Sequence, residues 1–247
     1  MPSDGLLAFA TVKVGKRSGF LALIDKGHNL TPEKTGAAST PTSPLYFDHI
    51  AVGATTLDVG AAYIQETLGI VMPPGGKHPR MGTHNLLTSL GPTSFLEVIA
   101  IDPDAPSPMT PRWYNLDRFQ GPPRILTWVV GTDSIHREID RLNGLAGEVT
   151  QVSRGNLTWD ISVPSDGSMP LDGAFPTLLQ WPRGAHVAAS MGSRGCSIKS
   201  LNVRHPEAQF ITNWLGNRYK GTSIEVTSGS FKLEAEIETP QGSRILD

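Results

Sequence analysis

Short apolar runs followed by helical periodicity recur three times along the chain. The first copy, YFDHIAVGATTLDVGAAYIQETLG, places Leu57, Ala61, Ile64 and Leu68 on one helical stripe, with Gly69 as a C-terminal cap. The apolar strands THNLLTSL and SFLEVIAID follow it. This order of elements predicts a β-α-β-β-β unit.

Two further copies repeat the same order of apolar and polar positions. RILTWVVGTDSIHREIDRLNGL precedes the strands LTWDISVP and PTLLQWP, and SIKSLNVRHPEAQFITNWLG precedes SIEV, FKLEAEIET and SRIL. Each copy covers roughly 50–60 residues, the length of one repeated supersecondary unit. Their helical stripes consist of Ile135, Ile139 and Leu142 in the second copy, and Ala208, Ile211 and Leu215 in the third.

The repeats divide the chain into three parts. Residues 1–44 end in the turn-rich run TPEKTGAASTPTSP and are predicted to be a largely disordered extension, with GFLALI as a short docking strand. Residues 45–183 are predicted to hold two paired units. Residues 184–247 hold a third, partial unit, packed on the pair or placed in a dimer interface. The predicted fold class is therefore α+β, with tandem βαβββ modules that form a cupped, half-open, barrel-like sheet.

Two paired units leave a concave face, which is where a ligand is expected to bind. Strand alternation places His49 on that face together with Phe47 and Ala51, and Glu97 together with Phe95. A glutamate inside an apolar strand is costly unless it is paired or bound to a metal. We therefore expect His49 and Glu97 to meet in the cavity.

The run FDHIAV…LGI…GGKHPRMGTHNLL…FLEVIA resembles the glyoxalase-like branch of the vicinal-oxygen-chelate superfamily, over residues 46–102 and more thinly to residue 183. The resemblance implies paired modules cupped around a divalent metal, with ligands from the first and last strands of a module. His49 and Glu97 occupy those positions. By register, Trp128 and Gln180 stand at the corresponding positions of the second module, so the usual four-ligand set is incomplete.

Two arrangements of the site follow from this resemblance. In the first, His49, Glu97 and His84 hold one divalent metal (Zn, Fe, Ni or Mn), with Gln180 or water completing the shell. In the second there is no metal, and His49 and Glu97 form a hydrogen-bonded pair that supplies a general base or a polar contact. Glu97 is the leading catalytic candidate, and His84 is a third ligand or a proton shuttle.

Residues around the predicted cavity suggest how a substrate would be held. The loop GGKHPRMGTHN has three glycines and several donors, and Arg80 and Asn85 are expected to orient an anionic group of the substrate. Trp128, with Gln180 on a neighbouring strand, is expected to wall an apolar pocket that suits flat organic molecules.

Composition narrows the class of function. The formal net charge is −2 with no strongly basic segment, so nucleic acid is not an expected partner. No apolar run reaches the roughly 20 residues that span a bilayer, so no membrane partner is expected. A single cysteine favours a reducing, cytoplasmic location. No glycine-rich nucleotide motif is present, so no nucleotide cofactor is expected.

The function expected from the sequence is that of a small-molecule enzyme of the glyoxalase-like class. Lyase, isomerase or dioxygenase chemistry on an oxygen-rich organic substrate is compatible with the expected site. The alternative is a non-catalytic protein of the same fold that binds or sequesters a small molecule. A homodimer is one arrangement that would complete the third unit.

Overall fold

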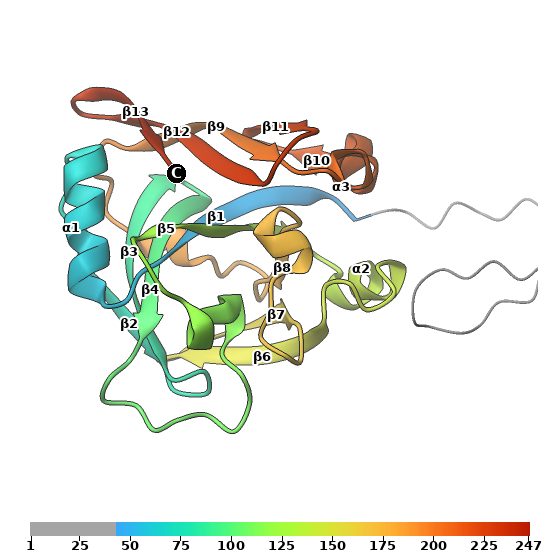
Figure 1. The fold of residues 1–247 in the computed structure, drawn as a ribbon, viewed down its shortest axis with the longest axis horizontal. Coiled ribbons are helices and arrows are strands. Elements are labelled where there is room, and N and C mark those ends of the chain that lie inside the picture. The colour runs from blue at the N-terminus through green and yellow to red at the C-terminus, as the bar shows by residue number, and fades with distance from the viewer. Residues whose placement is uncertain (1–42) are drawn as a thin grey trace, which may run out of the picture. The chain divides into compact units, whose positions relative to one another are not determined.

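The computed structural model describes residues 43–247, so the expectations for the N-terminal extension fall almost entirely outside the described residues. The described part is α+β and contains three units of the expected order (Figure 1). The first unit comprises β1 (Leu45–Gly53), α1 (Leu57–Leu68), β2 (Pro74–His78), β3 (Thr83–Gly91) and β4 (Ser94–Ile101).

The second and third units follow with short 3-10 turns between them. The second comprises β5 (Arg124–Thr132), α2 (Ile135–Arg141), β6 (Glu148–Arg154), β7 (Leu157–Val163) and β8 (Thr177–Gln180). The third comprises β9 (Ser197–Arg204), α3 (Ala208–Leu215), β10 (Tyr219–Lys220), β11 (Ser223–Thr227), β12 (Lys232–Thr239) and β13 (Gly242–Leu246).

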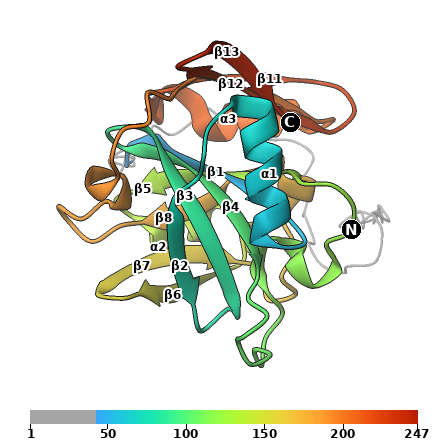
Figure 2. The same cartoon turned by 90° about the vertical axis from the view of Figure 1, so that its left-hand side faces the viewer.

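The first two units share one long sheet. Within residues 43–247 its strand order is β2-β3-β4-β1-β5-β8-β7-β6, with β10 added beside β1. The two end strands of this order, β2 and β6, lie against each other, which makes the sheet a nearly closed barrel (Figure 2). β1 and β5 join the two units as antiparallel neighbours. The barrel-like sheet expected from the sequence is therefore confirmed.

Helix α1 shows how local sequence determines one element. Thr56 caps its first turn by accepting a hydrogen bond from the Val59 N–H at 3.2 Å, and Gly69 ends it with φ of 71°. Ile64 and Leu68 are buried on the expected stripe. Gly60 is buried as well. Glycine is needed at this position because a Cβ would lie 2.3 Å from Val98 of β4.

The third unit covers the outside of the barrel. Its four-stranded sheet, β11-β9-β12-β13, lies over β1 and β5 (Figure 1). One side of this sheet is apolar and forms a continuous core with the outward-facing residues of β1 and β5. That side includes Leu201, Val203, Leu233 and Ile237. A single apolar layer between the two sheets therefore buries the convex face that the barrel would otherwise expose.

A second apolar cluster lies inside the barrel and borders the candidate site. It is formed by aliphatic residues of β1, β4, β5, β7 and β8 together with aromatic residues of the segment between β4 and β5. No helix within residues 43–247 is both long and apolar enough to cross a bilayer.

Candidate active site

A β-bulge in β1 turns two adjacent side chains toward the inside of the barrel. Phe47 pairs with Val130 of β5 and His49 pairs with Val129, so Asp48 has no partner in the register. Phe47 therefore packs in the core between the sheets, while His49 lines the inner pocket. Unbroken alternation predicts Phe47 and His49 on one face, and the bulge is the reason that the structure differs.

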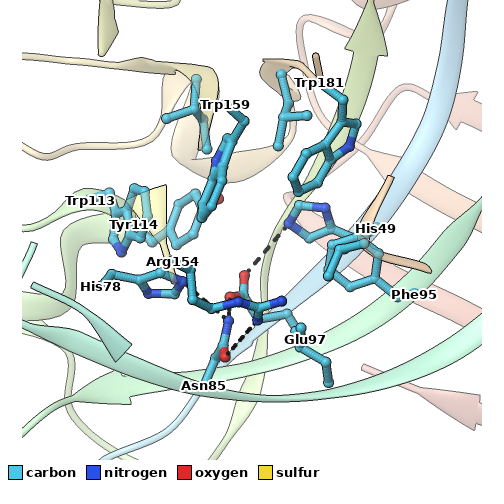
Figure 3. A pocket seen from close by; sticks show the side chains of 14 residues that line it. His49, His78, Asn85, Phe95, Glu97, Trp113, Tyr114, Arg154, Trp159 and Trp181 are labelled. Carbon is cyan, nitrogen blue, oxygen red and sulfur yellow. Dashed lines mark hydrogen bonds and ion pairs between the residues drawn. The ribbon is translucent and has the colours of Figure 1, made fainter. Parts of the chain in front are cut away.

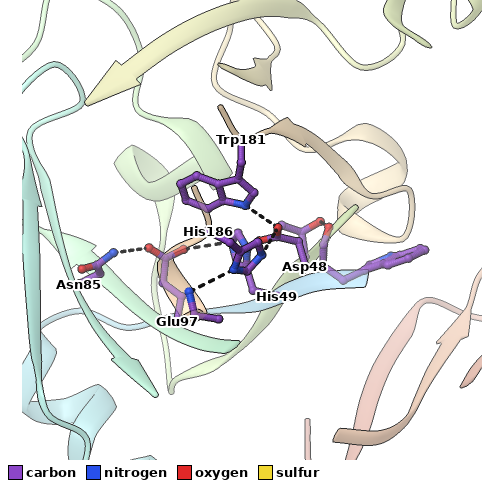
Figure 4. Close-up of polar contacts among 9 residues, drawn as sticks. Asp48, His49, Asn85, Glu97, Trp181 and His186 are labelled. Atoms are coloured by element: carbon purple, nitrogen blue, oxygen red, sulfur yellow. Dashed lines mark hydrogen bonds and ion pairs between the residues drawn. The ribbon is translucent and has the colours of Figure 1, made fainter. Parts of the chain in front are cut away.

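Asp48 is fully buried and accepts three hydrogen bonds. The donors are His49 Nδ1 at 2.6 Å, Trp181 Nε1 at 2.7 Å and His186 Nε2 at 3.1 Å (Figure 4). Nδ1 of His186 accepts the Ala188 N–H at 3.1 Å, so the proton of that ring lies on Nε2. Burial alone would raise the pKa of Asp48, but the hydrogen bonds from His186 and His49 hold it below its ordinary value. Asp48 is thus a permanent buried anion.

His49 carries the positive charge that faces this anion. Its ring stacks on Phe95 with centroids 4.2 Å apart, and its Nε2 lies 3.6 Å from Oε2 of Glu97 (Figure 3). Burial lowers the pKa of His49, but the bond to Asp48 and the facing Glu97 outweigh burial and raise the pKa to about 9. A separation of 3.6 Å suits an ion pair and is too long for a hydrogen bond. The Nε2–H of the charged His49 ring therefore faces the pocket and makes no hydrogen bond to another described residue.

Glu97 stands opposite His49 with one oxygen held and the other free. Oε1 accepts a hydrogen bond from Asn85 Nδ2 at 2.6 Å, and Asn85 Oδ1 in turn accepts the Gly76 N–H at 2.8 Å, which fixes the orientation of the amide. Burial raises the pKa of Glu97, but His49 and Asn85 lower it by more than burial raises it, so the group is a carboxylate. Among the described residues, Oε2 has no hydrogen-bond donor.

His78 is a buried histidine of the opposite character. Its Nε2 accepts the second N–H of Asn85 at 3.3 Å, and its Nδ1 lies 3.1 Å from Thr83 Oγ1. Burial lowers the pKa of His78 to about 4. At neutral pH His49 is therefore a cation and His78 is neutral. Asn85 connects His78 to Glu97.

The charge state of His78 gives a testable pH dependence. Its folded pKa of about 4 lies below its ordinary value of 6.5, so the unfolded chain binds more protons between these values. The contribution of His78 to the free energy of unfolding is complete above pH 6.5. It decreases by about 3 kcal/mol as the pH falls toward 4. NMR titration of the ring protons should show no transition of His78 above pH 5. A midpoint near 6.5 would contradict this account.

Aromatic side chains close the pocket above the charged groups (Figure 3). The cavity holds about 380 Å³, including the part open to solvent. Trp159 and Trp181 come from the second unit with ring centroids 5.3 Å apart, and Trp113 stacks on Tyr114 at 5.5 Å. The remaining lining residues are His49, His78, Asn85, Leu87, Phe95, Glu97, Arg154, Ile161, Leu179 and Val187.

The wall formed by Trp113 and Tyr114 has a strained backbone. Tyr114 and Asn115 both adopt left-handed conformations, with φ of 57° and 55°. Asn tolerates this region, but it is unfavourable for Tyr. The Asn115 N–H donates to Gly167 O at 2.7 Å and holds the turn in place. The indole N–H of Trp113 is buried without a hydrogen-bond partner among the described residues. Strain and an unpaired donor next to a cavity are typical of a binding site.

The structure brings together His49, Glu97 and Asn85 of the residues expected from the sequence, but it places His84 and Arg80 elsewhere. His84 alternates with Asn85 on β3 and so faces the other side of the sheet, where its Nδ1 lies 3.9 Å from Asp102. Arg80 is exposed in the turn after β2, and its Nη1 donates to Gln151 O at 3.4 Å. Neither side chain lines the pocket.

Trp128 and Gln180 also face away from the pocket, because each is one residue out of phase with it. Trp128 is fully buried in the core between the sheets and donates its indole N–H to Ala174 O at 3.0 Å. Gln180 accepts the Ile135 N–H at 2.9 Å and so holds the first turn of α2. Leu179 lines the pocket in place of Gln180, and Val129 is the residue of β5 that pairs with His49.

The donor set does not fit a divalent metal. Nδ1 of His49 is bonded to Asp48 and Oε1 of Glu97 to Asn85, which leaves one nitrogen and one oxygen directed at the same point. The second unit contributes the aliphatic side chain of Leu179 where a further ligand would be needed. Within residues 43–247, no group of three His, Cys, Asp or Glu side chains is placed to hold a metal ion.

Sequence reasoning missed several residues that complete the site. Asp48 forms the buried bond behind His49, and His186 reaches Asp48 from the segment after β8. Arg154 at the end of β6 reaches the pocket across the contact between β2 and β6. Asp48 could have been suggested by its place next to His49 in the sequence. The other residues could not, because their contacts join segments that are far apart in the sequence.

Comparison with known proteins identifies the family. The chain matches the Glyoxalase-like domain family over residues 47–218, which is well over half of its length, and it belongs to that family. No curated protein matches the sequence significantly.

Solved structures with a similar fold include a hypothetical protein from Staphylococcus aureus, at 15% identity and a TM-score of 0.47, covering 81% of this chain and 84% of that one. Another is methylmalonyl-CoA epimerase in complex with methylmalonyl-CoA and NH4+, at 16% identity and a TM-score of 0.39, covering 57% and 97%. The methylmalonyl-CoA epimerase of Mycobacterium tuberculosis has 17% identity and a TM-score of 0.37, covering 58% and 91%.

Proposed function

We propose that this protein is a small-molecule enzyme that moves a proton between carbon and oxygen of a carbonyl compound, with Glu97 as the base and His49 as the acid. The observation that carries the proposal is the buried chain of Asp48, His49 and Glu97 at the floor of an aromatic pocket. Paired acid and base groups of opposite charge, held apart by 3.6 Å, leave both reactive atoms available to a ligand.

His49 supplies the acid half of this pair. Asp48 holds the Nδ1–H, so the second proton of the imidazolium lies on Nε2 and faces the pocket. A carbonyl oxygen that accepts this proton is stabilised as negative charge develops on it. Asp48 remains ionised throughout and stabilises the charged ring, as the acid of a buried acid–histidine pair does.

Glu97 supplies the base half. As His49 transfers its Nε2 proton to the substrate oxygen, Glu97 loses its counter-charge, which raises the basicity of the carboxylate. Oε2 takes a proton from the carbon next to the carbonyl, the C–H electron pair becomes the C=C bond, and the carbonyl oxygen takes the proton of His49. Reprotonation of carbon by Glu97, with return of the oxygen's proton to His49, completes an isomerisation. In an elimination the oxygen also returns its proton to His49, the C=O bond re-forms, the C=C pair shifts to the next carbon, and the group on that carbon leaves with the proton of Glu97.

The site resets without an external acid or base. After formation of the enol, Glu97 is a neutral acid and His49 is a neutral imidazole. In both reactions the substrate returns one proton to His49 and takes one from Glu97, so the two groups regain their starting charges. Isomerase or lyase chemistry therefore uses only groups that the chain supplies, whereas dioxygenase chemistry needs a metal that this donor set does not suit.

The proposal makes a prediction about metal dependence. Dialysis against a chelator, followed by addition of Zn, Fe, Ni or Mn, should leave turnover and the thermal midpoint unchanged within error, because proton transfer runs through side chains alone. Elemental analysis of protein purified without a His tag provides the matching measurement. One divalent ion per chain that is lost in His49→Ala would contradict the proposal. The cytoplasmic location and the homodimer stay predictions, and light scattering of the purified protein would test the latter.

Hydrogen isotope exchange tests the function directly. A panel of small carbonyl compounds is incubated in D₂O with the protein, and deuterium at the adjacent carbon is followed by NMR. We expect exchange well above the protein-free rate for at least one compound, and this rate should fall by about 10²- to 10⁴-fold in Glu97→Gln. Binding of a compound without exchange would instead support the sequestering protein that is the alternative function.

A further inference from the structure

Arg154 is a half-buried cation that makes no salt bridge within residues 43–247. It lines the pocket, and its guanidinium makes one long hydrogen bond, from Nη1 to Asn85 Oδ1 at 3.4 Å. No carboxylate of residues 43–247 lies within 4.0 Å of it. Burial lowers the pKa of Arg154, because it removes water from around the charge, and the charge of Glu97 in the same pocket offsets this only in part. Most of its five N–H donors are therefore available inside the pocket.

The position of Arg154 depends on a glycine in the neighbouring strand. A Cβ at Gly76 would lie 2.3 Å from Cδ of Arg154, so the arginine stem occupies the space that a side chain on β2 would take. Gly76 also donates its backbone N–H to Asn85. The contact between β2 and β6 thus places Arg154 in the same pocket as Glu97.

An unpaired, partly desolvated charge is costly unless a ligand supplies the partner. Guanidinium groups bind carboxylates through two parallel hydrogen bonds, and this geometry is more specific than that of an ammonium group. The aromatic wall of Trp159, Trp181 and Tyr114 suits a flat apolar group beside the anion.

We propose, on the basis of the function proposed above, that the substrate is a small carboxylic acid with a flat apolar group. Its carboxylate binds Arg154, its ring lies against Trp159, and its carbonyl oxygen faces Nε2 of His49 with the neighbouring carbon beside Oε2 of Glu97. The ligand charge would balance a guanidinium that forms no salt bridge with the described part of the chain.

Binding of an unreactive probe tests the class of ligand apart from catalysis. Phenylacetate has the carboxylate and the ring but no carbonyl to be enolised, and phenylacetamide is its neutral counterpart. Calorimetry should show that phenylacetate binds the wild type and that phenylacetamide binds at least 10-fold more weakly. Arg154→Met should weaken phenylacetate binding by about 10- to 100-fold, the range for a charge-assisted hydrogen bond. Arg154→Lys should retain part of the affinity.

Two further variants control for folding and for net charge. Arg244→Met removes an exposed arginine on β13 and should leave the affinity for phenylacetate unchanged. Gly76→Ala keeps Arg154 but displaces its flexible stem, and it should weaken binding as well. Glu97→Gln removes a negative charge near the ligand and should bind phenylacetate at least as tightly as the wild type. Equal binding of acid and amide, or an unchanged affinity in Arg154→Met, would overturn the inference.

A reactive probe separates this inference from the proposed function. Phenylpyruvate carries the same ring and carboxylate plus a carbonyl with exchangeable neighbouring protons. Arg154-dependent binding of phenylacetate together with catalysed exchange of phenylpyruvate supports both proposals. Arg154-dependent binding with no exchange in any carbonyl compound supports the ligand class and overturns the enzyme. Exchange of neutral carbonyl compounds without any binding of phenylacetate supports the enzyme and overturns the ligand class.

Discussion

Replacing Glu97 with Gln should reduce catalysed proton exchange by about 10²- to 10⁴-fold, the usual contribution of a positioned base. The amide keeps an oxygen for the hydrogen bond from Asn85, so the pocket should retain its shape. It offers no lone pair of comparable basicity to the substrate carbon. The kinetic effect should lie in kcat, with KM little changed, because Glu97 acts on the proton in the transition state and contributes little to binding of the substrate.

The matched control is an exposed glutamate on the same domain. Glu66 lies on the outer side of α1, so Glu66→Gln changes the net charge by the same amount without touching the pocket. Its exchange rate and thermal midpoint should equal those of the wild type. If Glu97→Gln and Glu66→Gln had the same activity, Glu97 would not be the base.

Replacing Asp48 with Asn should destabilise the protein by about 3–5 kcal/mol, the cost of leaving a buried charge without its partner. Three donors, on His49, Trp181 and His186, converge on two carboxylate oxygens. An amide has one oxygen, and its NH₂ group would face another N–H. Chemical denaturation gives the free energy of unfolding, and Asp140→Asn, which changes an exposed carboxylate on α2, should cost no more than about 0.5 kcal/mol.

The pH dependence of this variant distinguishes an electrostatic role from a packing role. The folded pKa of His49, about 9, lies above its ordinary value of 6.5, so this group stabilises the fold fully below pH 6.5. That stability is lost as the pH rises through 9. Removing the Asp48 charge lowers the pKa of His49, so the alkaline loss should shift to lower pH and shrink. Parallel stability curves for the wild type and Asp48→Asn between pH 6 and 9.5 would contradict the pairing.

Features determined by local periodicity were predictable from the sequence. The helical stripes of Ile64 with Leu68 and of Ile211 with Leu215 are buried as expected. The alternation in β4 places Glu97 toward the pocket, because that strand is regular from Ser94 to Ile101. The repeated order of elements was sufficient to predict the barrel-like sheet, since a single small sheet cannot bury both of its faces.

Features determined by strand phase and by closure of the sheet were not predictable. The assignment of Trp128 and Gln180 to the pocket failed by one residue, because counting along a strand cannot detect a bulge or set the phase of a second unit. Arg154 could not be found because it reaches the site only after β2 and β6 meet. His186 reaches Asp48 through a segment with no periodic pattern.

The bulge in β1 has a consequence for how such a site is acquired. Without residue 48, the run Leu45, Tyr46, Phe47, His49, Ile50 is a strictly alternating strand, and every other side chain keeps its present face. In the register with β5, the carboxylate that holds His49 therefore stands on an extra residue that has no partner in the neighbouring strand. A single-codon insertion supplies the acid behind the histidine while the core on one side and the pocket on the other stay in place.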